Sequence, residues 1–171
     1  LDRTGFFPQY NINTLQLSRG VTDAGDVVFS EIARMAGVAY TGWSWSALFA
    51  DYDNDADRDL FVSNGYPKAV IDLDYQFNHR RARRIANPDA SQRLLREMLD
   101  SLGSYALPNY LFRNEGDLTF SDRAREWRLE QRGFSYGAAY GDLDNDGRLD
   151  LVVNNIDAPA SIYHNEVPGD A

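Results

Sequence analysis

Residues 142–155 read Asp-Leu-Asp-Asn-Asp-Gly-Arg-Leu-Asp-Leu-Val-Val-Asn-Asn, an aspartate-rich loop that runs directly into an apolar stretch. Carboxylates stand at loop positions 1, 3, 5 and 9. Like charges confined to so short a segment repel one another, and calcium relieves the repulsion because it accepts about six to eight oxygen ligands in flexible geometry. The β-branched residues after the loop favour a strand. The stretch therefore predicts a cation-binding loop whose last ligand is held by a β-strand.

The same pattern occurs once more in the chain. Residues 29–65 align without a gap onto 120–156 at a constant offset of 91, and 15 of the 37 aligned positions are identical. The earlier loop, 51–59, reads Asp-Tyr-Asp-Asn-Asp-Ala-Asp-Arg-Asp. We therefore expect two calcium sites. With a backbone carbonyl supplied at position 7 of the second loop, the predicted ligands are Asp51, Asp53, Asp55, Asp57, Asp59, Asp142, Asp144, Asp146, Arg148 and Asp150.

Other kinds of site fit these loops less well. An EF-hand needs a bidentate glutamate at position 12 and flanking helices, whereas position 12 is Val62 or Val153. Zinc prefers His or Cys ligands and magnesium a tighter octahedron. Two solvated acidic turns remain the alternative. In the first loop Ala56 replaces Gly147, and a positive φ costs a non-glycine residue about 1 kcal/mol, so the site at 142–150 is predicted to bind calcium more strongly.

A second repeat spacing reveals an insertion. Residues 111–115 recur as 162–166, an offset of 51, and the difference of 40 from the first offset places an insertion within 66–108. Leu94, Leu95, Met98, Leu99 and Leu102 form one helical stripe, with Asn87-Pro88 suited to a helix start and Gly103 to its end, which predicts a helix over 89–102. A less regular helix is expected over 72–86, which carries four arginines.

The remainder alternates short β-branched and aromatic runs with Gly, Asn and Asp clusters, a pattern typical of antiparallel strands. Strands are predicted at 14–18, 26–30, 43–50, 59–63, 109–113, 117–121, 134–141, 149–154 and 160–164. A repeat of about 50 residues with four short strands is typical of a propeller blade. The predicted fold is mainly β. It is a partial β-propeller of about two and a half four-stranded blades in one domain, 1–171, with the helical insertion 66–108 inside it.

Composition excludes several classes of protein. The formal net charge of −9 argues against a nucleic-acid binder, and the absence of cysteine excludes disulfides and thiolate metal sites. Aspartate outnumbers glutamate 20 to 6, which favours turns and hard-cation ligands over helical surfaces. No apolar run approaches the roughly 18 residues of a membrane span, and no export signal is visible in residues 1–25.

The motifs at 111–122 and 137–155 resemble the FG-GAP and VCBS repeat family of calcium-loop β-propellers. They are especially similar to its bacterial branch related to cartilage acidic protein, in which an ASPIC/UnbV segment often follows. The resemblance spans about three quarters of the chain. It implies a larger propeller, structural calcium in the hairpin loops, a location outside the cell and binding to proteins or glycans, with no catalytic residues.

Three further patterns allow different interpretations. Residues 133–137 fit the G-x-S-x-G nucleophile elbow, and Asp150 and His164 follow in triad order, so a serine hydrolase that uses Ser135 is the enzymatic alternative. The alternating aromatics near 43–45 and 134–136 suit packing between blades or stacking on sugars. The arginines at 80–84 suit a solvated helix face paired with aspartates, or a phosphate contact.

The sequence thus predicts a non-enzymatic, calcium-binding propeller segment. It would serve as a secreted or cell-surface scaffold or recognition module for a protein or glycan, with further blades or a partner chain covering its open faces. The same residues are also compatible with the propeller portion of a larger secreted enzyme, and with a calcium-responsive switch.

Overall fold

The structure is a computed structural model that describes residues 12–68, 70 and 73–167. Every predicted strand has a counterpart whose bounds lie within three residues of those expected, and the fold is mainly β, as predicted. The sequence did not predict α1, β5 or β8. The elements in chain order are β1 (Gln16–Val21), β2 (Val27–Glu31), α1 (Ala33–Ala36), β3 (Ser44–Ala50), β4 (Asp59–Asn64), α2 (Leu73–Ala82), α3 (Pro88–Ser101), β5 (Leu107–Pro108), β6 (Tyr110–Asn114), β7 (Phe120–Asp122), β8 (Arg132–Gly133), β9 (Ser135–Gly141), β10 (Asp150–Asn155) and β11 (Ser161–Tyr163).

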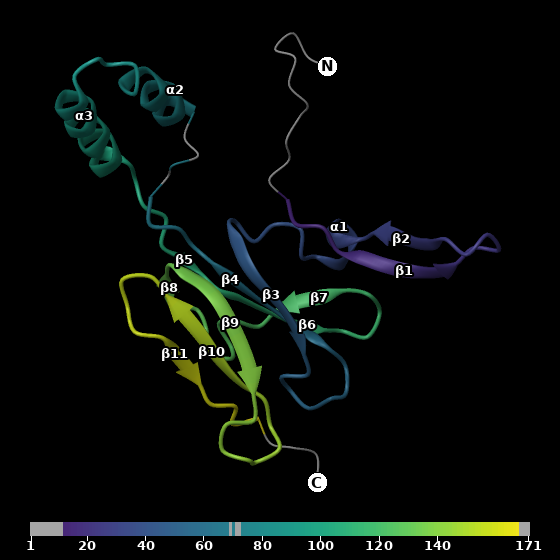
Figure 1. The fold of residues 1–171 in the computed structure, drawn as a ribbon. Coiled ribbons are helices and arrows are strands. Elements are labelled where there is room, and N and C mark those ends of the chain that lie inside the picture. The colour runs from purple at the N-terminus through teal and green to yellow at the C-terminus, as the bar shows by residue number, and fades with distance from the viewer. Residues whose placement is uncertain (1–11, 69, 71–72, 168–171) are drawn as a thin grey trace.

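Two antiparallel sheets form the body of the molecule (Figure 1). One has the strand order β3-β4-β6-β7 and the other β11-β10-β9. Strand β9 of the second sheet lies beside β3 and β4 of the first. The β1-β2 hairpin extends sideways, and β5 pairs with β8. All of these sheets are open in the part of the chain that the structure describes, so the structure supports the β-rich class and leaves the propeller itself as a proposal.

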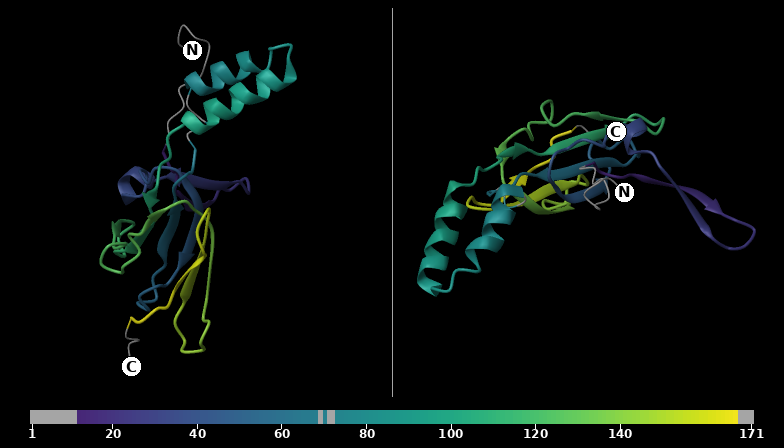
Figure 2. Two further views of the ribbon diagram at one scale, coloured as in Figure 1. Left: turned by 90° about the vertical axis from the view of Figure 1, so that its left-hand side faces the viewer. Right: turned by 90° about the horizontal axis from the view of Figure 1, so that it is seen from above.

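The insertion folds into two helices between β4 and β6 (Figure 2). These strands pair directly, with Leu60 opposite Phe112, so the sheet is continuous across the insertion. At its base the backbones of Tyr66 and Tyr105 exchange two hydrogen bonds of 3.1 and 3.0 Å, and their rings stack with centroids 5.0 Å apart. The contacts between Tyr66 and Tyr105 thus hold the two ends of the insertion together, and the helices project from the sheets beyond them. The pairing of β4 with β6 does not depend on the helices.

Local sequence explains the bounds of the helices. Asn87 accepts hydrogen bonds from the backbone N–H groups of Asp89 and Ala90 at 3.0 and 3.1 Å, and Pro88 occupies the first helical position, where it needs no donor. The helix predicted over 89–102 is α3. The less regular helix predicted over 72–86 corresponds to α2, which ends at Ala82. Residue 72, the first of the predicted range, lies outside the described residues.

The core consists of two apolar clusters on opposite faces of β4. One joins the sheets and includes Phe61, Leu111 and Val153. The other includes Leu60 and packs against α1. All six residues of β4 are buried, since both faces of this strand are covered. The covered faces explain why β4 lacks the alternating pattern of a half-exposed strand.

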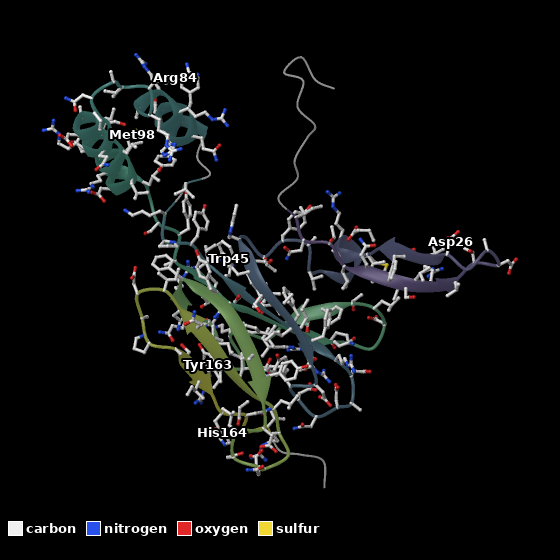
Figure 3. All side chains as sticks on the ribbon, viewed as in Figure 1. Asp26, Trp45, Arg84, Met98, Tyr163 and His164 are labelled. Atoms are coloured by element: carbon white, nitrogen blue, oxygen red, sulfur yellow. The ribbon has the colours of Figure 1, made fainter. Side chains whose placement is uncertain are left out.

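Aromatic residues that were predicted to pack between blades or to stack on sugars pack between the two sheets at one place. The ring of Trp45 on β3 stacks on that of Tyr136 on β9, with centroids 4.2 Å apart and an interplanar angle of 19°. The indole N–H of Trp45 also donates to the carbonyl oxygen of Gly65 at 2.7 Å. The stack joins the two sheets at the end nearer the helices (Figure 3).

Candidate metal-binding loops

The two aspartate-rich segments are hairpin loops at the same end of the two sheets, away from the helices (Figure 1). Loop 1 (51–59) joins β3 to β4, and loop 2 (142–150) joins β9 to β10. In loop 1 the first carboxylate, Asp51, accepts backbone hydrogen bonds from Asp55 and Ala56 at 3.2 and 3.0 Å. In loop 2 the carboxylate of Asp142 accepts the equivalent pair, both at 3.0 Å, from residues 146 and 147. The two loops therefore share one backbone geometry.

The last aspartate of each loop is buried and clamped between strands. Asp59 accepts backbone N–H groups from Tyr52 at 3.0 Å and from Asn114, at the end of β6, at 2.9 Å. Asp150 accepts from Leu143 at 3.0 Å and from Asn165, beyond β11, at 2.9 Å. Each aspartate is the first residue of its strand. The strand therefore holds the last carboxylate, and a residue at the end of the neighbouring strand or just beyond it is bonded to the same group.

Three carboxylates converge in each loop. Oxygens of Asp51, Asp53 and Asp59 lie within 4.8 Å of one another, and oxygens of Asp142, Asp144 and Asp150 do likewise. The oxygen-only donor sets suit a hard cation such as calcium. We call these sets the inner carboxylates of loops 1 and 2.

The remaining predicted ligands lie outside the inner carboxylates. Asp55 accepts the backbone N–H of Asp57 at 2.9 Å, and the side chain of Asp57 is exposed. Asp146 forms an ion pair with Arg148, whose Nε donates to the carbonyl oxygen of Asn165 at 2.8 Å. Asp146 also groups with Asp144 and His164. The inner sets thus hold positions 1, 3 and 9, and the intervening positions make backbone and ion-pair contacts.

Loop 1 contains buried polar atoms that have no hydrogen-bond partner among the described residues. They are Oδ1 of Asp53, Nδ2 of Asn54 and the hydroxyl group of Tyr52. Leaving a buried carboxylate oxygen unpaired is costly, whereas a cation at that oxygen would satisfy it. The residues of the loop therefore fit a bound cation.

The backbone at loop position 6 confirms the sequence-based reasoning about glycine. Gly147 has φ +86°, and Ala56 at the equivalent place has φ +71°. Ala56 is thus held in the left-handed region, where its Cβ makes the conformation less favourable than it is for glycine. The φ angles show a difference in the conformational energy of the two loops. That loop 2 binds calcium more strongly than loop 1 stays a prediction.

Sequence reasoning missed two residues that face the loops from the neighbouring strand. Arg113 on β6 forms ion pairs with Asp53, at 2.7 Å, and Asp55, at 3.0 Å. His164 lies 3.1 Å from Asp150 and 3.7 Å from Asp144 through its Nδ1 (Figure 3). The offset of 51 aligns Arg113 with His164, so the repeat itself contained the signal that could have found them.

The environments of the loops shift the pKa values of their carboxyl groups. Burial raises the pKa of Asp59 to about 6, with further contributions from the charges of Asp53 and Asp55. The pKa of Asp150 is lowered, first by the backbone N–H of Asn165 and then by that of Leu143. Ionisation of Asp59 therefore opposes folding of the metal-free protein, whereas ionisation of Asp150 favours it.

Asp59 leads to a pH-dependence prediction. A carboxyl group whose pKa is raised from 3.8 to about 6 binds its proton more tightly in the folded state, so stability falls as pH rises through that window. In the presence of chelator, Asp59→Asn should flatten this fall, as measured by urea unfolding between about pH 4 and 6. Asp150→Asn is the control, because a lowered pKa contributes stability that is lost only as pH falls below the unfolded value. Identical slopes for Asp59→Asn and the unmodified protein would contradict the prediction.

The residues of the proposed hydrolase triad are not assembled. Ser135 is buried, and its hydroxyl accepts from Asn109 at 3.1 Å and donates to Asn155 at 2.9 Å. The chain continues from Ser135 along β9 without the sharp turn and helix that a nucleophile elbow needs. Although Asp150 and His164 are in contact, Asp150 ends loop 2 and His164 faces that loop from just beyond β11, away from Ser135 and its asparagine partners. The elbow motif is therefore a chance match in sequence.

A pocket of about 420 Å³ lies beside loop 2. Its wall includes Trp127, Leu149 and Tyr163, together with His164 and Asn165, which also contact loop 2. This volume falls within the range of small-ligand sites. The pocket thus adjoins the residues that border loop 2.

Comparisons with known proteins find the same repeat. A family model described as FG-GAP-like repeat matches residues 98–153, which include loop 2 and Arg113. Cartilage acidic protein 1 of Homo sapiens is 37% identical over 57 residues, and this match covers 33% of the chain and 9% of the human protein. In the described part of the chain, no helix combines the length and the apolar character needed to cross a membrane. Residues 98–153 therefore match an FG-GAP-like repeat, and the comparisons agree with the resemblance of the chain to the FG-GAP/ASPIC type of repeat.

Proposed function

We propose that the chain is a calcium-stabilised segment of a β-propeller. It would act outside the cell as a non-enzymatic scaffold or recognition module for a protein or glycan. The observation that carries the proposal is the repeated loop, in which three carboxylates converge on one place in each of two equivalent hairpins.

The arrangement of strands supports the propeller part of the proposal. β3, β4, β6 and β7 form one antiparallel meander, the arrangement of a four-stranded blade. β9, β10 and β11 supply three strands of the next, and the offset of 91 makes β2 equivalent to β7, the last strand of a blade. The β1-β2 hairpin leaves Val21, Val27 and Phe29 exposed. Further blades or a partner chain would cover such faces.

Calcium would join strands of one blade. Asp59 and Asp150 already accept N–H groups from the neighbouring strand, so a cation bound by them would link the loop, its own strand and the next. A ligand that binds only the folded state stabilises it by about 2.7 kcal/mol at a hundredfold excess over Kd. Calcium outside cells would keep even a weak structural site filled. The FG-GAP-like repeat supports the extracellular location.

Recognition would use surfaces of the sheets and loops. The pocket beside loop 2 has aromatic walls, Trp127 and Tyr163, and aromatic faces suit the apolar faces of sugar rings as well as apolar side chains. Since loop 2 borders this pocket, a cation there would also rigidify part of its wall. The recognition role thus follows from the same loop that carries the stabilising role.

Thermal melts in calcium and in chelator test the proposal. We expect calcium near a hundredfold excess over the Kd of the loop 2 site to raise the free energy of unfolding by about 2.7 kcal/mol through that site, and by less through loop 1. Asp144→Ala should remove most of this gain and Asp53→Ala a smaller part, because loop 2 is the stronger site. Asp26→Ala in the distant β1-β2 hairpin is the matched control and should keep the full gain (Figure 3). Equal melting temperatures in both buffers would refute the calcium proposal.

A further inference from the structure

Two equivalent positions of the repeat place different side chains over the two loops. Residues 111–115 and 162–166 align at the offset of 51, so Arg113 and His164 occupy the same place. Each is followed by an asparagine whose backbone N–H binds the buried last aspartate of the loop, at 2.9 Å in both copies. This shared bond fixes the register of the preceding residue, which consequently faces the loop in both copies.

Arg113 pairs with Asp53, one of the inner carboxylates of loop 1, and leaves the other oxygen of that carboxylate, Oδ1, without a partner among the described residues. Its Nε donates to Oδ2 of Asp53 at 2.7 Å, and a terminal nitrogen donates to Oδ2 of Asp55 at 3.0 Å. The hydrogen bonds that Arg113 donates to these two carboxylates raise its pKa, first the bond to Asp53. A guanidinium keeps its charge and has no lone pair for a metal. Loop 1 therefore contains a cation supplied by the protein itself.

His164 makes a different contact with loop 2. Its Nδ1 lies 3.1 Å from Oδ1 of Asp150 and 3.7 Å from Oδ2 of Asp144. An imidazole nitrogen can itself act as a metal ligand, and ligand atoms of Asp144, Asp146 and His164 lie within 4.8 Å of one another. The side chain at this position of loop 2 is thus compatible with a metal.

Arg148, the arginine of loop 2, forms no ion pair with the inner carboxylates of that loop. Arg148 forms its ion pair with Asp146, which is not one of the three inner carboxylates. Arg113, in contrast, pairs with Asp53, which is one of them. The comparison separates an arginine that pairs outside the inner carboxylates from one that pairs with a member of them.

We propose that Arg113 is a resident counter-ion that stabilises loop 1 in place of part of the metal's charge. The residue at this repeat position, arginine or histidine, would then set how strongly each loop requires a divalent cation. This inference rests on the proposed calcium binding. It gives a second reason, besides Ala56, for loop 1 to be the weaker site.

Exchange of the two residues tests the inference. Calcium is titrated calorimetrically into the unmodified chain, Arg113→His, His164→Arg and the double exchange, and melting in calcium and chelator is recorded for each. Arg113→His should tighten the weaker site by up to about fivefold, and His164→Arg should weaken the stronger site by a similar factor, because each exchange removes or adds one cationic competitor. In the double exchange Asp53→Ala, rather than Asp144→Ala, should abolish the tighter binding.

Arg123→His is the matched control. The side chain of Arg123 has almost the same exposure as that of Arg113, 37% against 36%, but its ion pairs are with Glu115 and Glu126, outside both loops. It should leave both affinities unchanged. If Arg113→His folds only in calcium, that result also supports the inference, since the loop has lost its own cation.

The outcomes separate the two levels of the proposal. If the unmodified chain binds no calcium, the proposed function fails and the inference fails with it. If calcium binds but neither exchange changes either affinity, the inference alone is overturned. His164→Arg adds a positive charge beside loop 2 and keeps Arg113 at loop 1. If Arg113→His fails to fold, the calcium affinity of His164→Arg still tests the inference.

Discussion

Replacing Phe61 by alanine is expected to lower the free energy of unfolding by about 3–5 kcal/mol. Phe61 lies in the middle of β4 with none of its surface exposed, and it belongs to the apolar cluster that joins the two sheets. Truncation removes the buried ring and leaves a cavity. The neighbouring side chains of both sheets cannot fill it unless the backbones of their strands also move. Urea unfolding followed by circular dichroism measures the loss.

The matched control is another phenylalanine of the same chain. Phe77 on α2 is 72% exposed, so Phe77→Ala should change the free energy of unfolding by less than about 0.5 kcal/mol. A loss of stability for Phe61→Ala no greater than that for Phe77→Ala would show that β4 is not the core of the molecule.

Gly65→Ala is the second large effect, and we expect a loss of about 3 kcal/mol or more. Gly65 has φ +103°, and a Cβ there would lie 2.2 Å from the carbonyl oxygen of Gly133. Both the backbone of Gly65 and the approach of residues 132–133 to it would have to change. The bond from the Trp45 indole to the Gly65 carbonyl would be strained as well. Urea unfolding and Trp fluorescence would record the two consequences.

Gly103→Ala is the control for this substitution. No atom lies within 4 Å of the Cβ position at Gly103, and its φ is outside the left-handed region. The exchange should therefore be neutral, or stabilise by about 0.4–1 kcal/mol through the unfolded chain. Equal effects of the two substitutions would exclude the close approach at Gly65 as their cause.

The Phe61 prediction also bears on loop 1, because this loop depends on the strand β4 that holds its last carboxylate. Asp59 lies two residues before Phe61 on β4 and is itself fully buried. A cavity at Phe61 would free the start of the strand, and with it the carboxylate that accepts from Tyr52 and Asn114. We therefore expect Phe61→Ala to weaken calcium binding at loop 1 as a secondary effect, by loosening the ligand cage.

Features with a short-range cause could be predicted from the sequence. The strands were located because β-branched runs alternate with turn residues, and α3 because its apolar stripe, Asn87 and Pro88 lie within one segment. The offset of 91 related the two loops without any structure. Ala56 could likewise be assigned a positive φ, because its counterpart is a glycine.

Features that depend on contacts between distant residues could not be predicted in this way. The pairing of β5 with β8 joins short, non-periodic segments, and α1 is only four residues long, so neither has a pattern of its own. The burial of Asp59 and the rise of its pKa depend on the packing around β4. The arginines at 80–84 are exposed, which agrees with a solvated helix face; they form no ion pair with a described residue, and because Asp72 lies outside the described residues their pairing with aspartates stays a prediction.

The sequence by itself determined the β-rich class, the repeat, the helical insertion and the spacing of carboxylates in each loop, because these depend on neighbours along the chain. Only the tertiary structure decided which carboxylates converge and which residues face them. Arg113 and Asp53 are 60 positions apart and meet because β4 and β6 are adjacent in the sheet. Electrostatic contacts of this kind depend on distance in space, which the sheet pairing sets.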